Sequence, residues 1–118
     1  GCAVSQIVMS IVFRVAVSER HVLFLTGGAA RADPARAAAL VGAPLEKADA
    51  ASVRAATGFA IGGVAPLGHA APIAIWFDRG LLAHDTVWAA AGSPHHVFAV
   101  APARLLAATG ATEADFTA

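Results

Sequence analysis

The sequence predicts a single α+β domain with a mixed, mostly antiparallel sheet and short helices. The first observation is composition: 118 residues, 58% of them hydrophobic and 14% charged, are typical of a chain that buries a core rather than of a disordered one. The second is that β-branched segments are interspersed with short segments bounded by Asp, Pro and Gly. The third is that the two kinds of segment do not alternate strictly, which favours α+β over α/β architecture.

The first expected strand covers residues 6–17. Its odd positions, from Ile7 through Met9 and Ile11 onward, are apolar, whereas Ser10 and Arg14 lie on the other face. This alternation predicts a long, half-buried strand that places Met9 in the core. Residues 18–20 form a polar turn, and residues 21–26 are expected to pair with the first strand as an antiparallel hairpin.

Three helices are expected from their boundary residues. Asp33 and Pro34 begin a helix over residues 35–41, and Gly42 ends it. Asp49 precedes a second helix over residues 50–57, which stops at Gly58. A third helix starts at residue 102, covers residues 102–109 and stops at residue 110, which is again a glycine.

The remaining segments predict short strands joined by turns. Strands are expected at residues 73–77, 87–91 and 97–101, with a shorter one at 45–48. Residues 78–80 and 92–94 are expected to be turns, and Asp78 and Arg79 an exposed ion pair. We expect residues 111–118 to form a frayed tail or a short terminal helix.

Charge and cysteine content exclude several classes of protein. Eight basic and eight acidic residues cancel, so the chain has no basic field that by itself would give affinity for nucleic acid. A nucleic-acid partner must then be held by shape, by its end or through another protein. The single cysteine, Cys2, excludes an internal disulfide framework and a cysteine-clustered zinc site, and it fits a reducing cytoplasm. We predict no metal, no cofactor, no membrane span and no signal peptide.

A glycine-rich segment over residues 62–69 is the most unusual part of the sequence. Three glycines and a proline within seven residues predict a loop whose backbone approaches a ligand closely, although an ordinary connecting loop has the same composition. Exposed amides in such a loop hold a carbonyl oxygen or a carboxylate. His69, at its end, is a candidate for binding a substrate group or a water, or is a surface histidine without a role.

No nucleophile is evident elsewhere. Ser10, Ser52 and Ser93 have no recognisable Ser-His-Asp context. His95 and His96 are adjacent at the start of a strand, so they point to opposite faces and are poorly placed to share a metal. The residues alone thus predict a pocket and no mechanism.

Three spaced motifs resemble the YbaK and prolyl-tRNA editing domain family. The similarity covers nearly the whole chain, and its central motif is a Gly-x-x-x-Pro loop from Gly62 to Pro66. The motifs are QIV-x-SIVF at residues 6–13, ATGFAIGGVAPLGH at 56–69 and VWAAAGSPH at 87–95.

The resemblance implies a domain over residues 1–118 that hydrolyses the ester between a wrong amino acid and its tRNA. Such editing corrects what binding selectivity cannot, since one methylene or hydroxyl changes binding by only about 1–3 kcal/mol. The implied partners are the 3′ end of an aminoacyl-tRNA and, as a further option, a synthetase. The catalytic positions implied are Met9, Gly62, Gly63 and His69. The substrate-binding positions implied are Ser10, Val64, Ala65, Pro66, Gly68, Gly92, Ser93 and His95.

The sequence departs from the family pattern at two places. Met9 occupies the position of the family's functional lysine, and a thioether neither carries charge nor donates a hydrogen bond. The helices that precede the family's first long strand are not found here either. We therefore keep three hypotheses: a deacylase weakened by Met9, a catalytically silent relative that binds an aminoacyl-tRNA end or a synthetase, and a domain that binds a small molecule or peptide on the same scaffold.

Overall fold

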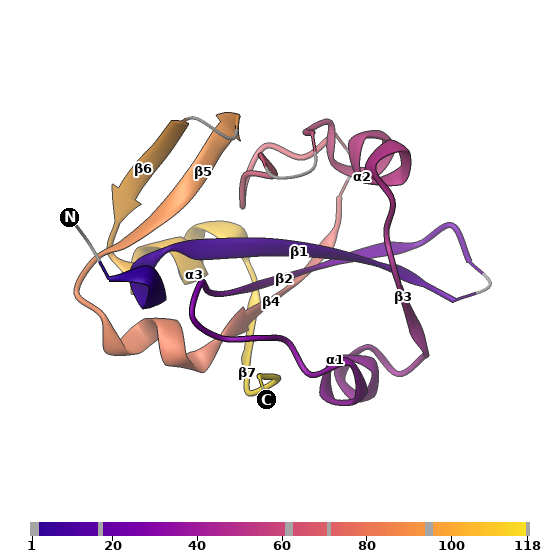
Figure 1. Cartoon of the computed structure of the whole chain (residues 1–118), viewed down its shortest axis with the longest axis horizontal. Helices are drawn as coiled ribbons and strands as arrows, with labels where there is room; N and C mark the ends of the chain where they lie inside the picture. Colours follow the sequence, from indigo (N-terminus) through magenta and orange to yellow (C-terminus); the bar gives the residue numbers. More distant parts are fainter. Residues whose placement is uncertain (1–2, 17, 61–62, 71, 94–95, 118) are drawn as a thin grey trace.

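A five-stranded sheet and a separate hairpin organise the chain (Figure 1). The computed structural model describes residues 3–16, 18–60, 63–70, 72–93 and 96–117. The helical elements are η1 (Val4–Gln6), α1 (Pro34–Val41), α2 (Ala50–Thr57), η2 (Arg79–Ala83) and α3 (Pro102–Thr109), where η marks a 3₁₀ helix. The strands are β1 (Val8–Val15), β2 (His21–Gly27), β3 (Leu45–Lys47), β4 (Ala74–Asp78), β5 (Val87–Ser93), β6 (His96–Val100) and β7 (Thr112–Ala114).

The large sheet has the strand order β3-β1-β2-β4-β7. β1 pairs antiparallel with both β2 and β3, whereas β4 pairs parallel with β2 and with β7. β5 and β6 form an antiparallel hairpin of their own. Figure 1 shows α2 and this hairpin on one side of the central strands and α1 on the other. The predicted α+β class with a mixed, mostly antiparallel sheet is confirmed.

β2 is the centre of the domain because both of its faces are covered. Leu23 and Leu25 belong to one core cluster, which includes residues of α2, α3 and β5. Val22 and Phe24 belong to a second cluster on the α1 side. None of these four side chains is exposed, which explains why the segment is an uninterrupted apolar run rather than an alternating one.

The helix boundaries are the predicted ones. The carboxylate of Asp33 accepts a hydrogen bond from the amide of Ala35 at 2.9 Å, and that of Asp49 accepts one from Ser52 at 2.7 Å. α1, α2 and α3 all end at glycines in the left-handed conformation. Each of these helices has eight residues, and no helix in the described part of the chain is long and apolar enough to cross a membrane.

The expectation for residues 111–118 was wrong. Thr112–Ala114 form β7, which extends the sheet beside β4, and Phe116 is fully buried. The Phe116 ring packs edge-on against Phe24, with 4.8 Å between ring centroids. Three residues are too few for periodicity to show a strand, and Phe116 closes a cluster whose other members, apart from Ala114, lie far away in sequence.

The expected ion pair between Asp78 and Arg79 was also wrong. Asp78 is 6% exposed, and its carboxylate accepts hydrogen bonds from the Thr26 hydroxyl at 3.2 Å and the Gly80 amide at 3.1 Å, which begins η2. Arg79 forms ion pairs instead with Glu113 of β7 and with Asp115, which follows β7. A hydrogen bond with Glu113 and the charge of Asp115 raise the pKa of the Arg79 guanidinium.

Met9 is not a core residue, contrary to the alternation argument. Its side chain is 49% exposed, and Ile7, on the same face, is 36% exposed. Ile11 and Phe13 pack against the second core cluster but Met9 does not, and the small residues Gly28 and Ala30 line the same cavity as Met9. The missing bulk leaves a cavity, so alternation identified the right face of β1 but not how far the core extends along it.

Candidate functional site

The loop after α2 is folded onto the domain rather than free. Val64 and Ala65 are 4% and 7% exposed, and Pro66 is fully buried. The Nε2 atom of His69 lies 2.7 Å from the carbonyl oxygen of Ala65. Because a carbonyl only accepts hydrogen bonds, Nε2 carries the proton and donates it. The side chain that the sequence offered as a catalytic candidate is therefore engaged in closing its own loop.

The amides of this loop are partly used within the chain. The Gly63 amide donates to the carbonyl of Ala60 at 2.9 Å, so it is not free to hold a substrate oxygen in this conformation. Gly62 lies outside the described residues.

Phe59 links the loop to the end of β5. Gly92 has φ +97°, and a Cβ built on it would lie 3.4 Å from the Phe59 ring. A Cβ on Gly68 would lie 3.8 Å from the same ring, and the His69 imidazole packs edge-on against it with 6.0 Å between centroids. The structure therefore brings three predicted site residues, Gly68, His69 and Gly92, around one aromatic ring.

Sequence reasoning missed this role of Phe59. The residue directly follows Gly58, the left-handed residue that ends α2, so its position after a helix stop was the available signal. Ser93, the neighbour of Gly92, ends β5, whereas His95 lies outside the described residues.

Ser10 and Val64 meet at a small cavity between β1 and the loop. Its volume is about 180 Å³. Most of its lining residues are apolar, and the two exceptions are Ser10 and Lys47. The lining residues are Ser10, Ile11, Val12, Lys47, Ala48, Val53 and Val64.

Met9 faces a different and larger cavity. Successive side chains of a strand point to opposite faces, so Met9 and Ser10 diverge although they are adjacent. The Met9 cavity has a volume of about 500 Å³ and is bounded by β1, β3 and the segment that leads into α1. Ile11 and Lys47 line both this cavity and the Ser10 cavity. The predicted positions Met9 and Ser10 thus lie on the two sides of one strand.

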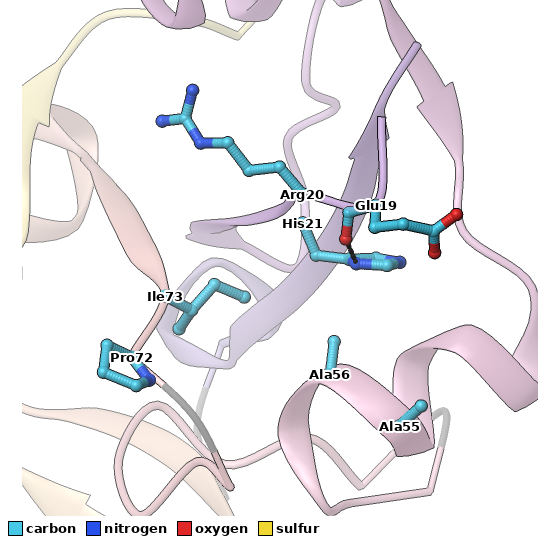
Figure 2. Close-up of a pocket in the computed structure, with 7 residues that line it drawn as sticks. All are labelled: Glu19, Arg20, His21, Ala55, Ala56, Pro72 and Ile73. Atoms are coloured by element: carbon cyan, nitrogen blue, oxygen red, sulfur yellow. Dashed lines mark hydrogen bonds between the residues drawn. The ribbon is translucent and has the colours of Figure 1, made fainter. Parts of the chain in front are cut away.

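Two other cavities lie near the loop and at the end of the β1–β2 hairpin. Pro66, Gly68 and His69 line a hollow of about 360 Å³ on the outer side of the loop. Figure 2 shows a cavity of about 320 Å³ at the end of the β1–β2 hairpin, where the Nδ1 atom of His21 lies 3.0 Å from the carbonyl of Glu19. None of the predicted site residues lines this second cavity, which lies instead against α2. Among the described residues, no group of three or more His, Cys, Asp or Glu side chains is placed to hold a metal ion.

Solved structures with this fold are similar along the whole chain. A crystal structure of a candidate trans-editing enzyme for prolyl tRNA synthetase is 46% identical, with a TM-score of 0.94, covering 100% of this chain and 74% of that one. A scaffold protein from computational epitope backbone grafting is 44% identical, with a TM-score of 0.94, covering 100% of this chain and 77% of that one. A hypothetical protein is 28% identical, with a TM-score of 0.91 and coverages of 100% and 78%.

The family comparison agrees with these structures. No curated protein sequence matches the chain significantly. The family model of the aminoacyl-tRNA editing domain matches residues 1–108. The chain therefore belongs to the aminoacyl-tRNA editing domain family.

Proposed function

We propose that this domain is an aminoacyl-tRNA deacylase, which hydrolyses the ester of a mischarged tRNA. The observation that carries the proposal is the family match over residues 1–108. The similarity to a candidate trans-editing enzyme supports it, as does a small apolar cavity beside the loop at Val64. The proposal places the reaction in the cytoplasm, with a tRNA synthetase as a further partner.

The chemistry relies on positioning rather than on a nucleophilic side chain. In the proposed reaction, a water oxygen attacks the ester carbon, the bond from that carbon to the ribose oxygen breaks, and a proton passes to the ribose oxygen. Membership of the family implies that a hydroxyl of the tRNA assists the water, which is consistent with a Ser10 cavity that no carboxylate or imidazole of the described residues lines. The loop and β1 hold the ester in place, which lowers the entropic part of the barrier.

Met9 favours a second candidate function, that of a catalytically silent relative that binds the aminoacyl end or a synthetase. A lysine at this position would put an ammonium where the chain has an exposed thioether. Loss of one electrostatic group of an active site typically lowers a rate by about 10²–10³.

A deacylation assay with a panel of mischarged tRNAs tests the proposal. The variant Met9→Lys is expected to hydrolyse at least one substrate about 10²–10³ times faster than the wild-type domain. Ile7→Lys is the matched control, because it adds the same charge to the same exposed face two residues away. If neither the wild-type protein nor Met9→Lys hydrolyses any ester while both are folded, the deacylase proposal is wrong and the binding function is favoured.

A further inference from the structure

Lys47 is one of two residues that line both cavities beside β1. β3 pairs with β1 only over Phe13–Val15, and Lys47 is the last residue of β3, opposite Phe13. Paired residues of an antiparallel ladder place their side chains on the same face, so Lys47 shares the face of Phe13 and Met9. Lys47 also lines the Ser10 cavity, at the point where the pairing of β3 with β1 stops. The one lysine of the sequence is therefore next to both cavities.

Two cations around these cavities have no counter-ion in the part of the chain that the structure describes. Arg14, Arg36 and Arg79 each pair with a carboxylate. Lys47 and Arg31, which both line the Met9 cavity, form no hydrogen bond or ion pair through their side chains with any described residue. The neighbouring Glu46 does not neutralise Lys47, because Arg14 already binds its carboxylate. These cations are thus available to an anion from outside the chain.

No acidic side chain of the described residues opposes them. Neither the Met9 cavity nor the Ser10 cavity has a lining Asp or Glu. By contrast, Glu19 lines the cavity at the hairpin end, and Asp78 and Asp115 line the one beside η2. A ligand with an anionic group and apolar or aromatic parts is therefore complementary in charge to the Met9 cavity.

The larger of the two cavities suits a nucleotide in size, and the smaller one suits an aminoacyl group. The Met9 cavity, at about 500 Å³, lies within the range of about 300–1,000 Å³ that is usual for small-ligand sites. The Ser10 cavity, at about 180 Å³, holds one small group against the apolar side chains of Val12, Val53 and Val64. An ester between a small acyl group and a nucleotide spans both cavities if it crosses beside Lys47.

From this arrangement, which rests on the proposed function, we infer that Lys47 and Arg31 bind the 3′-terminal nucleotide of the aminoacyl-tRNA. The nucleotide lies in the Met9 cavity, its phosphate contacts the Lys47 ammonium and the Arg31 guanidinium, and the aminoacyl group enters the Ser10 cavity. Binding of the nucleotide in this way needs no overall positive charge. The chain has a net charge of zero, and two local cations provide the phosphate contacts.

Binding of a non-hydrolysable substrate mimic tests the inference. The probe is a short single-stranded RNA whose 3′ end carries an amide-linked amino acid, titrated at several salt concentrations. We expect Lys47→Gln and Arg31→Gln each to weaken binding about tenfold. Each is also expected to reduce the slope of log affinity against log salt by about 0.7, the value for one phosphate contact on a single strand. Lys47→Arg keeps the charge and is expected to retain most of the affinity.

Arg104→Gln is the matched control, because it removes one exposed charge from α3 and lines neither cavity. If Lys47→Gln and Arg31→Gln bind the probe as Arg104→Gln does, with an unchanged salt slope, the inference is wrong while the proposed function stands. A wild-type domain that neither binds the probe nor hydrolyses any mischarged tRNA would overturn the proposed function together with the inference, because no substitution is involved in that result. Adenosine monophosphate is expected to compete with the probe, and a lack of competition at saturating concentrations would contradict the placement of the nucleotide.

Discussion

The imidazole of His69 donates from Nε2 to the carbonyl oxygen of Ala65 across 2.7 Å, and this hydrogen bond closes the loop over a buried proline. The loop's shape therefore depends on a side chain that belongs to the loop itself. The edge-on contact with Phe59 fixes the same imidazole from a second direction.

Replacing His69 by Ala is expected to lower the free energy of unfolding by about 1 kcal/mol, because the Ala65 carbonyl loses its donor. Urea denaturation measures this. His84→Ala serves as the control, since no hydrogen bond of the His84 side chain is found among the described residues. Equal stability of the two variants would mean that the His69 hydrogen bond does not hold the loop.

A substitution at Gly92 tests the contact between β5 and Phe59. Gly92→Ala forces a left-handed residue at φ +97° and puts a methyl group 3.4 Å from the ring, so we expect a loss of more than about 1 kcal/mol in the free energy of unfolding. Gly110→Ala is the matched control, because φ there is +65° with nothing within 4 Å of the added Cβ. Thermal denaturation compares the stabilities of the two variants. If the Gly92 variant is no less stable than the Gly110 variant, the Phe59 ring moves aside without a measurable energetic cost.

Phe116→Ala is expected to lower the free energy of unfolding by about 3–5 kcal/mol, because it empties a fully buried site against Phe24. Thr112→Ala, at an exposed position of β7, is expected to change it by less than about 0.5 kcal/mol. Guanidinium denaturation of both variants makes the comparison. A similar, small effect for both would indicate a frayed end rather than a strand.

The Thr26 hydroxyl and the Asp78 carboxylate form a buried polar pair in the sheet, 3.2 Å apart. We expect Thr26→Val to cost about 1–3 kcal/mol, because Asp78 then keeps a buried oxygen without that donor. A double-mutant cycle with Asp78→Ala is expected to give a coupling of about 0.5–3 kcal/mol. Additive effects would show that the two groups do not interact.

Local signals were sufficient for much of the fold. Asp33, Asp49 and the glycines after each helix act within one turn, so the sequence alone placed α1, α2 and α3 correctly. Phe116 and Asp78 were misjudged because their partners, Phe24 and Thr26, are distant in sequence. Their burial depends on β2 lying between β1 and β4, which no local pattern encodes.

The candidate site was less predictable than the fold. Composition identified the loop of Val64 and His69, but not that His69 bonds to Ala65 or that the Gly63 amide is already used. Met9 and Ser10 were taken together from a motif, although a strand sends them to opposite faces. Lys47 belongs to none of the sequence motifs. Its place beside the two cavities is evident only from the structure, where the pairing of β3 with β1 ends.

The position of Lys47 beside both cavities has a practical consequence for chemical labelling. As the sequence has one lysine, an amine-directed reagent modifies a single lysine side chain, that of Lys47. A fluorescent reagent of this kind places its dye on a residue that lines both cavities. The emission of the dye then reports whether a ligand occupies either of them.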